Sequence, residues 1–349
     1  MSNAPYITQL GDSTTPLANM SIQVLSKAAN NNALNTQGYP AITELLLSGN
    51  SHFASTFNLD AFAEGTISEL RTIDLSNTSG KSFALNLVKN PDQASEYTVF
   101  TKLTSIDISN SSCISSVLIP EVPLKNLKVA NSSIQTFKLK NQHYLSDVDL
   151  TGCNFLNSII LQNCSAYKKL QINALPNITS ISIAQCKSIE SIEITNCSSL
   201  KSVDIEYCAN LKSIVITGNS GLTGTVSETN FVTIKACKNL QTLDLSNNTN
   251  LAQITFEYSD EGGQANLATL KLHDTHVTSF KIDNTTDLDL SAFTGLVSPT
   301  FYHITELTSV QFANNPDNPI PLTESFQGCT NLTRIYGCVR LSASASGTY

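Results

Sequence analysis

The dominant feature of the sequence is an 11-residue repeat that continues without a break from Leu145 to Leu222. Aliphatic residues hold its fourth and sixth positions, and Cys, Leu or Asn holds its ninth. Its first position is filled by Leu145, Leu156, Tyr167, Ile178, Ile189, Leu200, Leu211 and Leu222. A fixed period of this kind is the signature of a solenoid, in which each repeat is covered by its neighbours.

The fourth and sixth positions lie two residues apart, so in an extended chain they face the same side. The residue between them is mostly polar, as Ser182 is between Ile181 and Ile183. Each repeat therefore predicts a short strand with an apolar inner face. The bulky inward side chains of one repeat need more volume than an 11-residue ring encloses. We therefore predict two repeats per coil, roughly 21–23 residues, with stacked coils pairing parallel strands at about 4.8 Å.

Toward the N-terminus the repeats are further apart, starting at Ile42, Leu70 and Leu103. These coils are long enough to contain helix on the return side, and residues 57–70 and 83–100 are the candidates. Residues 19–29 carry apolar side chains at helical spacing and predict a short capping helix. The resulting domain boundaries are an N-terminal arm and capping helix at 1–38, a solenoid at 39–341 and a tail at 342–349.

The repeat L-x-x-I-x-I-x-x-(N/C) resembles the leucine-rich-repeat segment. The phrase from Phe326 to Ile335, F-x-G-C-x-x-L-x-x-I, is similar to the repeat of the BspA-like subclass, found in bacterial surface proteins and some of their phages. The resemblance implies a leucine-rich-repeat solenoid, α/β to mostly β, with short parallel strands stacked in a curved right-handed coil. It also implies a surface, adhesive or virion role.

Composition narrows the classes of partner and location. Charged residues make up 14% of the 349 residues, the net charge is −8 and no basic run occurs, so we do not expect nucleic acid as the partner. No apolar stretch approaches the length of a membrane span. The first residues lack the positive start and apolar core of a signal peptide. The expected location is a virion or cell surface, with a cytoplasmic scaffold as the alternative.

Five of the nine cysteines share the ninth repeat position: Cys153, Cys164, Cys186, Cys197 and Cys208. The period alone explains them, because this position is a buried turn in the repeat class that the sequence resembles. There is no C-x-x-C pair, so a thiolate metal site is not expected. With two repeats per coil, Cys164, Cys186 and Cys208 fall on one edge and Cys153 and Cys197 on the other. We predict buried free thiols.

Two other groups were weighed as metal sites. His273 and His276 are the only closely spaced histidines, yet they fall where a strand gives way to a turn. Asp260 and Glu261 precede two glycines and have oxygen ligands that suit calcium, but one acidic pair in a loop is weak. We expect no metal and no cofactor.

Asp147 and Asp149 are the candidate catalytic pair. On a strand they point the same way, about 6–7 Å apart, and paired carboxylates can hydrolyse a glycoside. Lys169 is expected beside Asp147 on the next coil, which favours a surface ion ladder. The strand columns also hold almost no aromatic residues for stacking on sugars. A carbohydrate-active solenoid is thus the alternative, and we expect no enzyme.

The remaining signal is a surface built from the fifth repeat position. Alternate repeats give two outer columns, and Leu118 and Ile160 predict that one of them is partly covered. The other, more charged column is expected on an open concave face, which solenoids commonly use for binding. Together with neighbouring charges, the candidate residues are Asp107, Lys128, Asp147, Asp149, Lys169, Gln171, Glu193, Asp244 and Lys271.

These observations predict a non-enzymatic recognition or assembly scaffold. The expected partner is a protein or a surface glycan. The polar N-terminal arm and the open C-terminal edge of the solenoid predict that the chain is part of a larger assembly. An intracellular scaffold for one protein partner stays open as an alternative.

Overall fold

The structure is a computed structural model of the chain, which divides into two compact units, Met1–Tyr167 and Lys168–Tyr349. The described residues are 9–10, 43–51, 70–87, 100–119, 121–223, 231–252, 254–257, 267–277, 287–291, 296, 298–301, 307–317, 319–321 and 326–340.

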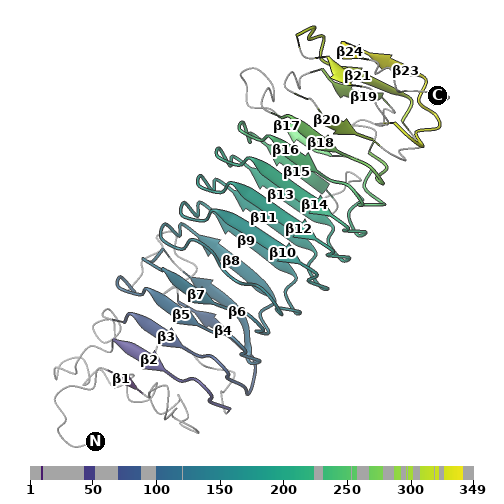
Figure 1. Cartoon of the computed structure of the whole chain (residues 1–349). Coiled ribbons are helices and arrows are strands. Elements are labelled where there is room, and N and C mark those ends of the chain that lie inside the picture. The colour runs from purple at the N-terminus through teal and green to yellow at the C-terminus, as the bar shows by residue number, and fades with distance from the viewer. Residues whose placement is uncertain are drawn as a thin grey trace, which may run out of the picture. The chain divides into compact units, whose positions relative to one another are not determined.

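The N-terminal unit contains two sheets of parallel strands (Figure 1). The first sheet has the order β1-β2-β3-β5-β7, with bounds Gln9–Leu10, Glu44–Leu46, Thr72–Asp74, Ser105–Asp107 and Asn126–Lys128. In the second, β9, β8, β6 and β4 pair in that order, with bounds Ser158–Gln162, Thr136–Lys140, Ile114–Ile119 and Phe83–Asn86. Strands that are consecutive in the sequence therefore alternate between the sheets over much of this unit.

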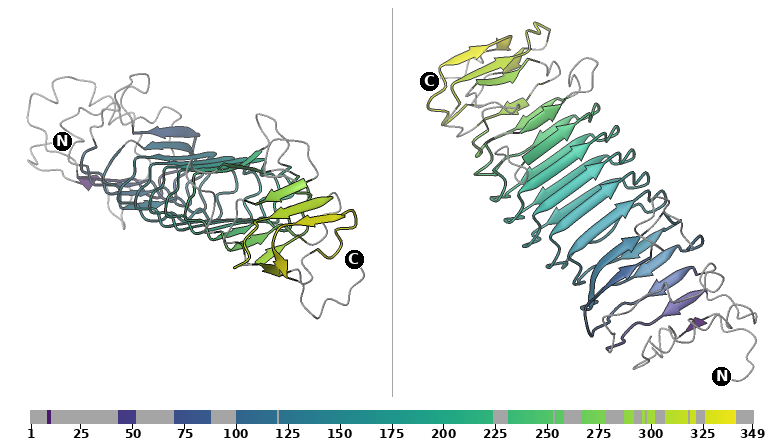
Figure 2. Two further views of the ribbon diagram at one scale, coloured as in Figure 1. Left: turned by 90° about the horizontal axis from the view of Figure 1, so that it is seen from above. Right: turned by 180° about the vertical axis from the view of Figure 1, so that it is seen from behind.

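The C-terminal unit repeats this arrangement of parallel strands (Figure 2). Its six-stranded sheet has the order β10-β12-β14-β16-β18-β20, with bounds Lys169–Asn173, Ser191–Thr195, Ser213–Thr217, Thr242–Asp244, Thr269–Lys271 and Ser298–Thr300. Opposite it, β11, β13, β15 and β17 pair in order, with bounds Ser180–Ala184, Ser202–Glu206, Phe231–Lys235 and Thr255–Glu257. Toward the C-terminus come β19-β21-β23 (Asp287–Leu290, Ser309–Phe312, Arg334–Tyr336) and β22-β24 (Ile320–Pro321, Val339–Arg340).

The strand register confirms two repeats per coil. In the C-terminal unit Lys169 pairs with Ser191 and Ser191 with Ser213, whereas the intervening strands pair separately, Ser180 with Ser202. Contacts between successive coils accordingly join residues 22 positions apart, as in the bond from Gln171 to Glu193. This is the architecture of a leucine-rich-repeat solenoid, with the strands stacked in parallel. Its curvature and handedness stay predictions.

The core is the aliphatic stack between the sheets. Ile183, Ile194 and Ile205 each expose 0% of their surface, and the five-residue strands alternate buried and accessible side chains. The apolar side chains of each coil pack against those of the coils on either side, so each coil depends on its neighbours to bury its core. The inward direction of the fourth and sixth positions is confirmed.

Each strand ends in the same backbone device. The eighth position has a positive φ in turn after turn, including Asn163 (54°), Ala174 (53°), Asn196 (57°) and Tyr207 (53°). This left-handed conformation reverses the chain and directs the ninth position into the core, where Cys197 and Cys208 are fully buried. Asparagine adopts this conformation more readily than most residues, and here its amide also links successive coils, since Asn163 Nδ2 donates to Asn141 Oδ1 at 2.8 Å.

The expectation of helix at residues 83–100 is wrong at its start. Phe83–Asn86 is strand β4, with Phe83 and Leu85 buried and Ala84 exposed, which is a period of two. No helix occurs among the residues that the structure describes. Of the helix predicted at 57–70 only Leu70 is described, and it lies in no helix. The helix predicted at 19–29 lies wholly outside the described residues. From the predicted arm, Gln9–Leu10 forms a strand that pairs in parallel with β2. The tail 342–349 lies outside the described residues.

Candidate binding face

The outward side chains of the six-stranded sheet in the C-terminal unit form a regular array, which we call the Gln171 face. The register confirms the predicted column at its centre, because Gln171, Glu193, Val215, Asp244 and Lys271 stand opposite one another in succession. The face also includes Lys169, Asn173, Ser191, Thr195, Ser213, Thr217, Thr242 and Thr269. Adjacent rows are about 4.8 Å apart in such a sheet.

At one end of the Gln171 face a carboxylate joins two coils. Glu193 Oε2 accepts a hydrogen bond from Gln171 Nε2 at 2.9 Å and lies 4.0 Å from Lys169 Nζ. The charged groups keep about half of their surface in water, so the pair contributes little to stability. Its charges stay accessible to a partner.

Further along the same column Asp244 is held more tightly. Its Oδ1 accepts hydrogen bonds from Ser246 Oγ (2.6 Å) and Ser246 N (3.1 Å), and its Oδ2 lies 3.1 Å from Lys271 Nζ. Burial raises the pKa of this carboxyl, but the bonds from Ser246 and the Lys271 ammonium outweigh burial, so the pKa lies below its usual value. Asp244 therefore ends β16 with an Asx-turn while it pairs with the next coil.

The N-terminal unit builds the same arrangement from Asp107 and Lys128. Asp107 Oδ1 accepts from Ser109 Oγ (2.6 Å) and Ser109 N (3.0 Å), and its Oδ2 lies 3.1 Å from Lys128 Nζ. In both units, the sequence D-x-S with a lysine at the paired position one coil later gives the same aspartate turn and the same ion pair. Sequence reasoning placed these residues in the column and missed their role as strand-ending turns.

Asp147 and Asp149 are both exposed, but no strand is assigned to residues 145–150, so the expected geometry of two carboxylates on one strand is wrong. Asp149 Oδ1 accepts the amide of Thr151 at 2.9 Å, and the hydrogen bonds from Thr151 lower the pKa of this carboxyl. A carboxyl with a lowered pKa is a poor general acid at neutral pH. Ser146 Oγ lies 3.3 Å from Asp147 Oδ1.

The cysteines are free thiols, and eight of them are buried, with only Cys338 partly accessible. The prediction of buried free thiols is confirmed. Burial raises the pKa of Cys153 and Cys197. Cys208 shares a hydrogen bond with Cys237 on the next coil, and that bond together with burial raises its pKa. Burial and a raised pKa keep Cys153, Cys197 and Cys208 in the thiol form as core residues.

The residues weighed as metal ligands have local partners where they are described. His273 Nδ1 lies 3.0 Å from Asp274 Oδ2, and Asp274 occupies a turn with φ 56°. Asp260 and Glu261 lie outside the described residues. Within the part of the chain that the structure describes, no group of three or more His, Cys, Asp or Glu side chains could hold a metal ion.

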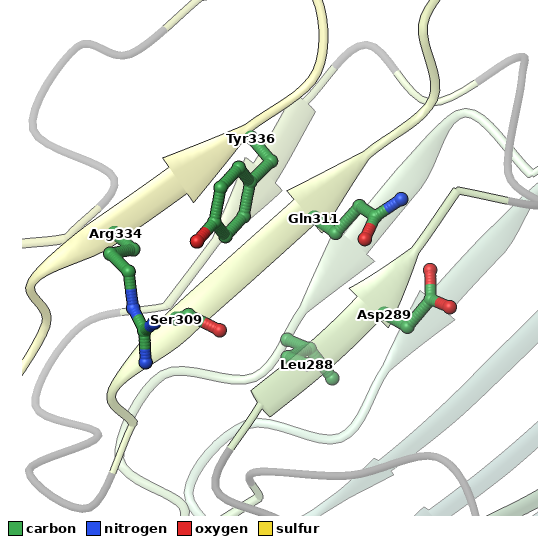
Figure 3. Close-up of a pocket in the computed structure, with 6 residues that line it drawn as sticks. All are labelled: Leu288, Asp289, Ser309, Gln311, Arg334 and Tyr336. Atoms are coloured by element: carbon green, nitrogen blue, oxygen red, sulfur yellow. The ribbon is translucent and has the colours of Figure 1, made fainter.

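A second polar surface lies at the C-terminal end of the chain, and sequence reasoning missed it. A hollow of about 170 Å³ is lined by Leu288, Asp289, Ser309, Gln311, Arg334 and Tyr336 (Figure 3). The repeat register could have found part of it, because Gln311 and Tyr336 hold the fifth position of the repeats that start at Leu307 and Leu332.

None of the described residues belongs to a helix that could span a membrane.

No protein-family model and no curated protein matches the chain. Among solved structures it is similar to a leucine-rich-repeat protein of Leptospira interrogans, at 16% identity over 91% of this chain and 88% of that one, with a TM-score of 0.20. An internalin of Listeria monocytogenes matches at 14% identity over 95% and 97%, TM-score 0.23. A leucine-rich cell surface protein of Faecalibacterium prausnitzii matches at 11% over 90% and 82%, TM-score 0.20. At these TM-scores the superpositions are poor, and the architecture follows from the register above.

Proposed function

We propose that this chain is a non-enzymatic recognition or assembly scaffold that binds a protein partner through the Gln171 face. The resemblance of residues 326–335 to the BspA-like repeat supports a role at a bacterial cell surface or on a phage virion, which is part of the proposal. The N-terminal arm and the C-terminal edge are the proposed points of attachment to a larger assembly.

The observation that carries the proposal is the fixed display of mixed polar groups on the Gln171 face. The strands that carry it are bonded in register to neighbouring strands, so the backbone holds these side chains at fixed spacings. A preorganised surface loses less entropy on binding. Accessible charges of both signs, Lys169 and Glu193, would set the orientation of a partner, and Val215 between the charged rows offers an apolar contact.

The decisive experiment reverses the charges of the face without changing net charge. In the double variant K169E/E193K the face presents the opposite pattern, and we expect at least a tenfold loss of binding to the purified virion or cell envelope. The matched control is E206K/K235E on the opposite sheet, where Glu206 and Lys235 are cross-strand neighbours. Equal loss in both variants, or unchanged binding in the first, would contradict the proposal.

Assembly is tested separately by light scattering and electron microscopy. A ring, or recovery of the chain only together with other chains, supports an assembly component. A monodisperse monomer over a wide concentration range, with immunogold label absent from virions and envelopes, argues for the intracellular scaffold instead.

A further inference from the structure

The hollow at the C-terminal end lies where the small side chain of Ser309 stands among larger side chains on three neighbouring strands. Asp289, Gln311 and Tyr336 stand opposite one another on β19, β21 and β23, and Ser309 stands opposite Arg334 in the row beside them. Ser309 is small and only 6% exposed, whereas Gln311, Arg334 and Tyr336 are longer and exposed. Figure 3 shows Arg334 beside Ser309, with Tyr336 on the neighbouring strand and Gln311 and Asp289 farther along the sheet.

The hollow differs from the Gln171 face in how far its polar side chains are engaged within the protein. Asp289 Oδ1 accepts the amide of Ser291 at 2.9 Å, which leaves Oδ2 available. Within the described chain, no hydrogen bond or ion pair engages the side chains of Gln311, Arg334 or Tyr336. By contrast, Glu193 and Asp244 on the Gln171 face each lie within 4.0 Å of a lysine ammonium. The hollow thus offers an acceptor, an amide, a guanidinium and a phenol to a ligand.

The strands beneath these groups are braced from the core side. Phe301 stacks on Phe326 with ring centroids 5.0 Å apart, and Phe312, which follows Gln311, lies 6.2 Å from Phe301. Cys329 Sγ donates to Phe301 O at 2.9 Å. A Cβ added at Gly337 would lie 2.4 Å from Phe312 O, so the turn after β23 is pressed against β21. Phe326 and Cys329 of the motif, together with Gly337, therefore pack against the strands that carry Gln311 and Tyr336.

From this geometry we infer that the hollow binds a single sugar ring of a glycan. Its volume lies below the roughly 300 Å³ at which pockets for drug-sized ligands begin, so one ring is the fitting size. Asp289 Oδ2 and the Gln311 amide would bond ring hydroxyls, the Tyr336 ring would cover the apolar face of the sugar, and Arg334 would bond a hydroxyl or a carboxylate. Asp289 disfavours a phosphate in the same space.

This inference extends the proposed scaffold and does not depend on it, because the hollow and the Gln171 face share no residue. The glycan site would give the scaffold a second, sugar-dependent contact. Variants of one surface should leave the other unaffected, which keeps the two proposals experimentally distinct.

The test is saturation-transfer difference NMR on the full-length chain with a panel of neutral and acidic methyl glycosides, followed by titration of any that bind. We expect at least one to bind with a Kd on the order of 1 mM, as befits a small exposed site. Y336A should weaken that binding tenfold or more. Asp289→Asn, which retains an acceptor for Ser291 N, should weaken it several-fold. Melting curves by circular dichroism establish that both variants fold.

The matched control is Y207A, because Tyr207 is 47% exposed and Tyr336 is 48% exposed. Y207A and K169E/E193K should bind the glycoside as the wild type does. Arg334→Gln separates sugar types, since an acidic sugar would lose most of its affinity and a neutral one little, and either result supports the site. Absence of binding across the panel, or equal loss with Y207A and Y336A, would overturn the inference.

Discussion

The ninth repeat position shows how one residue joins neighbouring coils. Asn219 is fully buried, accepts a hydrogen bond from Cys197 N at 2.9 Å and donates Nδ2 to Ile194 O (3.2 Å) and Thr217 O (3.0 Å). At other turns cysteine takes the same place and donates to a backbone carbonyl, as Cys197 does to Thr195 O at 3.4 Å. Asparagine supplies both an acceptor and a donor, so it satisfies more of the buried backbone.

We predict that Asn219→Ala lowers the stability of the chain by about 2–4 kcal/mol, because it leaves several buried backbone groups without a partner. Asn219→Cys should cost less, since the chain uses cysteine at this position elsewhere. Urea unfolding followed by circular dichroism measures both. Equal losses would mean that packing alone decides this position.

The eighth position leads to a prediction of opposite sign. Ala174 has a φ of 53°, where a Cβ is strained. Ala174→Gly should therefore stabilise the chain by about 0.5–1 kcal/mol. Ala184→Gly, on strand β11, should destabilise it by a similar amount, because glycine only adds freedom to the unfolded chain there. Thermal melts of both variants give the comparison, and a loss of stability in each would refute the strain.

Among the elements, the three-residue strands β3, β5 and β16 end in an aspartate turn, and Asp289 near the end of the four-residue strand β19 makes the same turn. Asp74, Asp107, Asp244 and Asp289 each accept the amide two residues on, at 2.9–3.1 Å. The bond fixes the strand end locally, and where a lysine follows on the next coil the same carboxylate adds a second link. Such a strand is short because its last outward residue is used to begin the turn.

The lowered pKa of Asp244 predicts a pH dependence. A depressed carboxyl pKa adds stability above the unfolded value of about 3.9, and this stability is lost as pH falls through the folded pKa. The double-mutant cycle of Asp244→Asn with Lys271→Gln should thus show coupling at pH 7 that disappears below the folded pKa. Urea midpoints at pH 7 and in the acid range measure it, and coupling that persists in acid would contradict the ion pair.

Sequence reasoning was accurate where the structure depends on the period. The strands, the inward isoleucines and the order of Gln171, Glu193 and Val215 all follow from side chains two apart at 11-residue intervals. The prediction of a helix at 83–100 was wrong at its start because the repeat period constrains the repeated strands and not the segment between them. In that segment Phe83 and Leu85 are buried and Ala84 is exposed, which is the alternation of a strand. The hollow was missed because Ser309 and Arg334 become neighbours only through coil stacking.

For the whole molecule, the thiols give a measure of integrity. Eight of the nine cysteines are buried and Cys338 is partly accessible. Under native conditions we expect one thiol per chain to react quickly with a thiol reagent such as DTNB, and the other eight to react only after unfolding. Mass spectrometry of the labelled chain identifies the site. Rapid labelling of Cys186 or Cys208 would mean that the coils open far more readily than their burial implies.

The coils also differ in length without losing alignment. Neighbouring turn residues are 22 positions apart for much of the C-terminal unit but 29 apart between Asn219 and Asn248, and the flanking strands still pair residue for residue. Extra chain inserted after Thr223 thus leaves the stack undisturbed. That edge is therefore the natural place to graft a foreign peptide or epitope, and a lineage carrying this fold can vary there while its scaffold stays the same.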